Sequence, residues 1–186
     1  MARLIYFANA SLDGYIEDES GSFDWSEPSD EVHLFFNDLV RSSDTFLYGR
    51  RLYETMAVWE TDRSLAEGSE VNRDFARGWQ DADKVVYSRT LEQPSTKRTR
   101  IEREFDAEAV RRMKESAETD LLIGGAELAA EAFRAGLVDE VGLRLVSVAV
   151  GAGKPALPVD QRLDLELRDE RRFDDGTVCL SYGVKS

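Results

Sequence analysis

Glycine, serine and arginine follow directly on three apolar segments of the chain. Each segment has the length and composition of a buried strand. The three groups are Gly49-Arg50-Arg51, Ser88-Arg89 and Gly124-Gly125. Glycine lets a backbone approach a phosphate closely, and arginine offers paired N–H donors that match phosphate oxygens. These residue types therefore indicate binding of a phosphorylated ligand.

All three groups come where a predicted strand ends. Parallel strands of an open α/β sheet deliver their carboxyl ends to one edge, and ligands bind in the crevice outside that edge. A helix that begins directly after Gly125 would present free N–H groups to a pyrophosphate. Taken singly, a glycine pair serves packing as often as binding, and a lone arginine is mostly a solvated charge. Their recurrence at successive strand ends favours a dinucleotide with an additional phosphate, NADPH rather than NADH.

The segments that must position these residues alternate between strand and helix patterns. Between 30 and 41, apolar residues recur at i, i+3, i+4 and i+7, which predicts an amphipathic helix. Strands are predicted at 4–10, 45–48, 84–87, 121–123, 141–150, 163–168 and 178–184, and helices at 30–41, 51–58, within 62–80, 108–118 and 126–135. Gly136 stands where the last helix needs a C-terminal cap. This order predicts an α/β fold: a mostly parallel central sheet with helices on both faces and a C-terminal antiparallel hairpin.

Composition narrows the class of protein. The chain has 186 residues, 42% of them hydrophobic, which predicts a single domain spanning 1–186 with a core of its own. With one cysteine, Cys179, and one histidine, His33, it offers no intramolecular disulfide, and no metal site is expected. No run approaches the roughly 20 apolar residues of a membrane span, so we expect a cytoplasmic protein. The net charge of −13 disfavours nucleic acid and anionic membranes as partners.

Four segments, in order along the chain, resemble motifs of two related families. Residues 11–16 (Ser-Leu-Asp-Gly-Tyr-Ile) are similar to the S-L-D-G-x-I segment of the riboflavin-biosynthesis reductase domain, the RibD C-terminal domain. Residues 47–54 resemble the G-R-x-T-W-E segment of dihydrofolate reductases. Residues 86–89 and 123–128 resemble the S-R strand end and the I-G-G-x-x-[IL] segment of both families. The resemblance spans almost the whole chain and is more specific for fold and cofactor than for substrate.

This resemblance implies a dihydrofolate-reductase-like three-layer fold with NADPH as cofactor. The reaction would be hydride transfer to a pyrimidine- or pteridine-like substrate, as in the 5-amino-6-(5-phosphoribosylamino)uracil reductase of riboflavin biosynthesis. The cofactor-binding residues it implies are Ala8 and Ile16 at the nicotinamide, Gly49, Arg50 and Arg51 at phosphates, Ser88 and Arg89 at the adenosine end, and Gly124, Gly125, Ala126 and Glu127 at the pyrophosphate.

Two differences from the dihydrofolate reductase motifs bear on the identity of the substrate. The chain lacks the L-P-W segment that precedes the substrate-binding carboxylate of dihydrofolate reductases, and Leu52 replaces the threonine of their G-R-x-T motif. Dihydrofolate reduction is therefore the alternative rather than the favoured activity. A protein that binds NADP(H) without turnover is a second alternative.

Ser11, Asp13 and Trp25 are the candidate catalytic residues. Asp13 would orient the substrate or relay a proton, or it forms a plain Asp-Gly turn. Trp25, next to Asp24, would stack on a heterocycle, or it anchors a capped loop. We expect His33 at the surface or an edge, and Cys179 as an inert core residue.

The chain carries two further patterns outside these motifs. Residues 151–154 (Gly-Ala-Gly-Lys) lack the spacing of a phosphate loop and are interpreted as a structural turn. The apolar strand over 141–150 and the C-terminal hairpin offer surface for pairing, as in the riboflavin-pathway domains. A homodimer is therefore expected.

Overall fold

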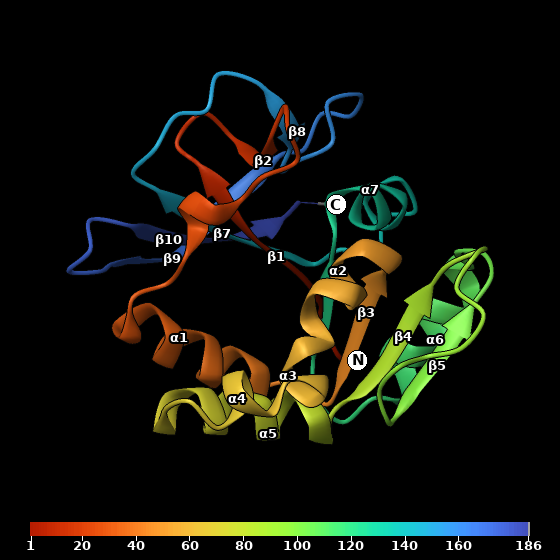
Figure 1. Ribbon diagram of the computed structural model, residues 1–186. Coiled ribbons are helices and arrows are strands. Elements are labelled where there is room, and N and C mark those ends of the chain that lie inside the picture. The colour runs from red at the N-terminus through yellow and green to blue at the C-terminus, as the bar shows by residue number, and fades with distance from the viewer. Residues whose placement is uncertain (186) are drawn as a thin grey trace.

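An eight-stranded mixed sheet runs through the computed structural model, which describes residues 1–185 (Figure 1). Its strands are β1 (Leu4–Ser11), β3 (Thr45–Gly49), β4 (Asp83–Tyr87), β5 (Thr99–Glu102), β6 (Leu121–Gly124), β7 (Glu140–Val146), β9 (Leu165–Arg172) and β10 (Val178–Val184). They lie in the order β5-β4-β3-β6-β1-β7-β10-β9. The pairs from β5 to β7 are parallel, and β10 is antiparallel to both β7 and β9.

Helices cover both faces of this sheet. One face packs against α1 (Asp30–Arg41), α2 (Arg50–Met56) and α5 (Glu70–Asp81), and the other against α6 (Ala107–Ser116) and α7 (Ala126–Arg134). Side chains alternate along a strand, so Ile5 joins the first core and Tyr6 the second. Strands buried on both faces need nearly continuous apolar runs, and that is the pattern the sequence shows. The predicted α/β three-layer fold is confirmed.

Several predicted boundaries are confirmed, and others are wrong. The strand predicted at 163–168 is β9, which runs from Leu165 to Arg172. The helix over 30–41 is observed to the residue, and Gly136 follows α7 with φ +65°. The strand predicted to reach 150 ends at Val146, because the backbone then turns toward the loop after β1, where Leu12 N–H donates to the Val148 carbonyl at 2.7 Å. The segment 62–80 holds α4 (Arg63–Ala66) and α5, separated where Ser69 caps α5.

The sequence did not predict three short strands. β5 is one, and β2 (Tyr15–Asp18) and β8 (Gly153–Pro155) pair with each other beside the main sheet. Their residues are half-buried or exposed, so they carry no apolar signal. The short helices η1 (Asp24–Ser26) and α3 (Val58–Thr61) complete the chain's elements over 1–185. No helix in this described part is long and apolar enough to cross a membrane.

Candidate functional site

The three glycine and arginine groups meet at the carboxyl edge of the sheet. β6, β3 and β4 lie side by side and parallel, with Tyr48 opposite Gly124 and Gly49 opposite Tyr87. A Cβ built on Gly125 would have the backbone nitrogen of Gly49 as its nearest neighbour, at 3.9 Å. The structure therefore brings together the strand ends from which the sequence predicted a single anion-binding edge.

The two glycines after β6 differ in what they do. Gly125 has φ +93°, which favours glycine, and is the N-cap of α7. Within the described residues no side chain caps this helix, so its first N–H groups remain available to a ligand. Gly124 serves packing, because a Cβ there would lie 2.4 Å from Leu52 Cδ2 of α2.

Two of the predicted arginines stand at the rim beside surface carboxylates. Arg50 Nε lies 2.7 Å from Glu54 Oε1, and its Nη1 donates to Thr90 Oγ1 at 2.7 Å. Arg89 has an 80% exposed side chain and lies 3.6 Å from Glu104. Exposed pairs of this kind contribute little stability, so either guanidinium can exchange its carboxylate for a phosphate.

Ser88 holds the turn that carries Arg89. Its hydroxyl is buried with the rest of the residue and accepts hydrogen bonds from the N–H groups of Thr90 at 3.3 Å and Leu91 at 3.0 Å. Arg103 Nη1 donates to the Ser88 carbonyl at 3.0 Å. Ser88 therefore shapes the strand end, and its predicted contact with adenosine stays a prediction.

A lysine that the sequence analysis assigned to a turn lies at this edge. Lys154 Nζ is 3.1 Å from both Glu17 and Glu127, the second of which is in the first turn of α7. Burial opposes the lysine's charge, but hydrogen bonds to these two carboxylates outweigh it and raise the pKa of Lys154. Arg51, 82% exposed, lies 3.7 Å from the same Glu17. The sequence feature that could have identified Lys154 as a site residue is its position directly after the glycines of 151–153.

A close backbone approach puts Lys154 there. β8 passes so near β2 that a Cβ on Gly153 would lie 1.9 Å from the Glu17 carbonyl oxygen. Only glycine fits this contact, and the residue after it then reaches α7. Residues 151–154 were interpreted as a structural turn, but Gly153 and Lys154 lie in β8, and the lysine side chain contacts Glu127 of α7.

Ser11 and Asp13 form a hydrogen-bonded turn after β1. Asp13 Oδ1 accepts from Ser11 Oγ at 2.6 Å and from Val150 N–H at 3.1 Å, and Oδ2 accepts from Gly151 N–H at 2.7 Å. The bond from Ser11 in particular lowers the pKa of Asp13. An ionised carboxylate that accepts three hydrogen bonds within the turn favours the turn interpretation over proton donation.

The remaining predicted residues lie on β1, β2, η1 and α7. Ala8 is half-buried on β1 against the core under α7, and Ile16 is half-buried on β2. Ala126 and Glu127 open α7. Trp25 lies in η1, and its Nε1 is buried without a hydrogen-bond partner among the described residues.

The single histidine and cysteine lie in the packed layers. His33 was expected at the surface or an edge; it is half-buried, with ring centroids of Trp59 and Phe75 at 5.5 and 5.3 Å. Burial lowers its pKa. Cys179 is buried and free, as predicted, and burial raises the pKa of its thiol to about 12.

Comparison with known protein families identifies the family to which the chain belongs. The family described as the RibD C-terminal domain matches residues 2–179. The chain belongs to this family. The resemblance seen in the sequence motifs is therefore confirmed, and the RibD C-terminal domain family is one of reductases, which implies a small-molecule substrate.

Relatives of this RibD C-terminal domain extend over its whole length. It is 30% identical over 182 residues to a Bacillus subtilis protein named uncharacterized protein YyaP, covering 97% of this chain and 94% of that protein. A structure described as a riboflavin biosynthesis protein from Shewanella sp. PV-4 superposes with a TM-score of 0.77 at 20% identity, each chain being covered in full.

Two further structures tie the fold to named enzymes. Enterococcus faecalis dihydrofolate reductase matches with a TM-score of 0.65 at 14% identity over 99% of this chain and 97% of that one. The Thermotoga maritima diaminohydroxyphosphoribosylaminopyrimidine deaminase/5-amino-6-(5-phosphoribosylamino)uracil reductase matches with a TM-score of 0.65 at 14% identity. The match covers 99% of this chain and 57% of the Thermotoga chain. At these identities the likeness shows a dihydrofolate-reductase-like fold.

Proposed function

We propose that this chain is an NADPH-dependent reductase acting on a pyrimidine- or pteridine-like heterocycle. The observation that carries the proposal is the meeting of Gly49, Arg50, Arg89 and Gly125 at one edge of the sheet. In a chain of net charge −13, this edge offers a polyanionic ligand arginines whose surface carboxylate partners a phosphate can replace.

The residues at this edge fit NADPH. The open N-terminus of α7 at Gly125 would hold the pyrophosphate, with Lys154 beside it. Arg50 and Arg89 would hold the additional phosphate that distinguishes NADPH from NADH. The bound cofactor supplies the hydride, and the protein supplies alignment and exclusion of water.

For the substrate we favour 5-amino-6-(5-phosphoribosylamino)uracil or a related compound. The Thermotoga neighbour is named as a reductase of that substrate, and the Enterococcus neighbour as a dihydrofolate reductase. Leu52, which stands in place of the threonine of the folate enzymes, packs against Gly124. We assign Asp13 a positioning role in the turn beside the nicotinamide residues Ala8 and Ile16, because its bonds keep it ionised.

NADPH oxidation measured with each of the two substrates tests the proposal. We expect turnover with the phosphoribosylaminouracil compound and little or none with dihydrofolate. Turnover of dihydrofolate alone would reverse the ranking. Tight NADPH binding without oxidation across a panel of heterocycles would instead support the binding protein without turnover.

A further inference from the structure

Three ion pairs link the two helix starts that meet at the glycine-rich edge. Arg51, in the first turn of α2, lies 3.7 Å from Glu17 of β2. Lys154 of β8 lies 3.1 Å from the same carboxylate and 3.1 Å from Glu127, in the first turn of α7. The pairing of β2 with β8 holds this arrangement beside α7 (Figure 1). Lys154 is therefore a cation shared by two carboxylates at the edge of the sheet.

The two carboxylates differ in how firmly they are held. The side chain of Glu17 is 20% exposed, and its backbone lies against β8, where a Cβ on Gly153 would come within 1.9 Å of the Glu17 carbonyl oxygen. The side chain of Glu127 is 83% exposed, and Lys154 is its one ion-pair partner among residues 1–185. Because an exposed ion pair contributes little stability, Lys154 can release Glu127 far more easily than Glu17.

Glu127 stands where a bound anion would compete with it. The start of a helix favours negative charge, and the first N–H groups of α7 carry no side-chain cap within the described residues. An ionised carboxylate only accepts hydrogen bonds, so the side chain of Glu127 has no donor to offer a phosphate. A pyrophosphate at this helix start and the Glu127 carboxylate would therefore both seek the ammonium group of Lys154.

We infer that Glu127 is an internal competitor of the cofactor: Lys154 exchanges the Glu127 carboxylate for the pyrophosphate of NADPH, while Glu17 keeps the lysine in position. The three N–H donors of an ammonium group allow Lys154 to hold Glu17 and a phosphate oxygen together. The inference rests on the proposed function and adds to it a contact that lowers cofactor affinity. NADPH and NADH share the pyrophosphate, so the exchange affects both, unlike the contacts assigned to Arg50 and Arg89.

Removing the competitor is the first test. Glu127→Gln should bind NADPH and NADH each about two- to fivefold more tightly than wild type by titration calorimetry, because Lys154 no longer leaves a carboxylate. Glu131→Gln is the matched control. Glu131 lies on the same helix, its side chain is 55% exposed, and it pairs with Arg134 at 2.9 Å rather than with Lys154. This control removes the same charge and should change neither affinity.

Removing the lysine tests the exchange itself. Lys154→Met keeps the length of the side chain, removes its charge and should weaken both cofactors about tenfold. In that background Glu127→Gln should bring no gain, because there is no lysine to release. An equal gain from Glu127→Gln with and without Lys154 would show simple repulsion of the cofactor and overturn the exchange. If Lys154→Met fails to fold, the comparison of Glu127→Gln with Glu131→Gln still decides.

The remaining outcomes separate this inference from the proposed function. An unchanged or weaker NADPH affinity in Glu127→Gln, or an equal gain in Glu131→Gln, overturns the exchange and leaves the proposed function standing if wild type binds NADPH. Tighter binding of NADPH alone, with NADH unchanged, also overturns it, because the pyrophosphate is common to both. Failure of wild type to bind NADPH would end the proposed function and this inference with it.

Discussion

At the scale of single residues, the proposed contact of Arg50 and Arg89 with the additional phosphate of NADPH leads to a direct prediction. Each pairs with one surface carboxylate, which a phosphate can displace. Arg50→Ala or Arg89→Ala should weaken NADPH about tenfold or more, since hydrogen bonds to charged groups are worth about 1.5–3 kcal/mol. NADH should be nearly unaffected, as titration calorimetry can establish.

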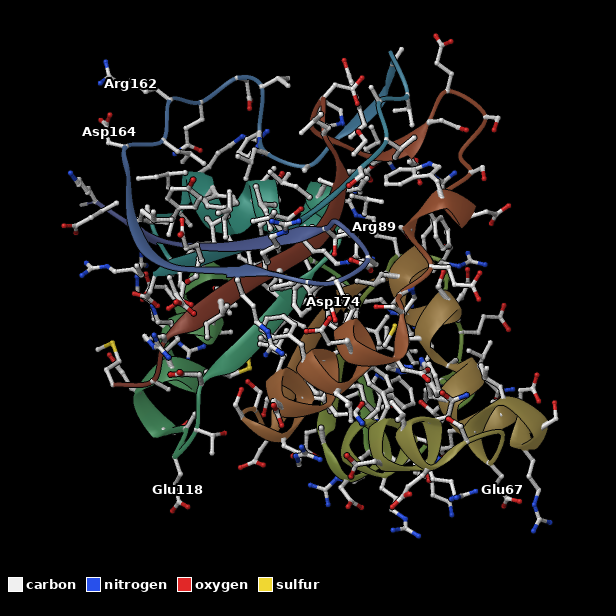
Figure 2. All side chains as sticks on the ribbon, turned by 90° about the vertical axis from the view of Figure 1, so that its left-hand side faces the viewer. Glu67, Arg89, Glu118, Arg162, Asp164 and Asp174 are labelled. Atoms are coloured by element: carbon white, nitrogen blue, oxygen red, sulfur yellow. The ribbon has the colours of Figure 1, made fainter. Side chains whose placement is uncertain are left out.

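Arg162→Ala is the control for that comparison. Arg162 also pairs with a carboxylate, Asp164, at 2.8 Å, but on the outer loop before β9, where Figure 2 shows both side chains at the periphery. Its removal should alter neither affinity. Equal losses of NADPH and NADH in the Arg50 and Arg89 variants would refute their contact with the additional phosphate.

The lowered pKa of Asp13 predicts how the stability of the fold changes as the pH falls. Its pKa is lower in the folded chain than the ordinary value of about 3.9, so it stabilises the fold fully above that value. The contribution is lost as pH falls through the folded pKa. Asp13→Asn should therefore unfold at a lower temperature than wild type at pH 6, with the difference shrinking toward pH 2. A constant difference in Tm across this range would show that the ionised carboxylate is not what matters.

The residues of the site differ in how far sequence could predict them. Arg50, Arg89 and Gly125 were predicted because each follows an apolar strand, which is a local signal. Lys154 was missed as a site residue, because its role comes from a contact with chain far away in sequence, at Glu127. The two possible roles of Asp13 were separable only once its partners at 150 and 151 were visible.

At the scale of elements, α2 and β6 touch through Gly124 and Leu52. Gly124→Ala would put a Cβ 2.4 Å from Leu52 Cδ2, and such overpacking costs about 1–3 kcal/mol. Leu52→Ala in the same chain should recover part of that loss, because it removes the atom that clashes. Urea unfolding of the two single variants and the double variant measures the coupling. Strictly additive losses would contradict a direct contact.

Element boundaries were predictable where local signals end an element. Ser29 caps the N-terminus of α1, and Gly136 follows the C-terminus of α7. Residues adjacent in the sequence therefore set both of these helix ends. β7 was predicted too long, because its end is set by hydrogen bonds to the loop after β1 rather than by a change in residue type. β2 and β8 are held by each other and carry no apolar pattern of their own.

At the scale of the whole molecule, the sheet restricts how two copies could pair. β7 was expected to offer pairing surface, but both of its edges are occupied, by β1 and β10. β9 is the free edge on that side, and its side chains are mostly exposed and charged, with Leu167 half exposed. A homodimer would therefore use β9 or the half-buried apolar face of β10. Light scattering should give twice the 21.0 kDa of one chain, and a monomeric mass would remove the prediction.

The account as a whole depends on where NADPH binds. A crystal structure of the chain grown with NADPH tests this most directly. We predict the pyrophosphate against the N–H groups that open α7 at Gly125, and the additional phosphate between Arg50 and Arg89. NADPH bound away from this edge of the sheet, or crystals without it at saturating concentration, would contradict the account.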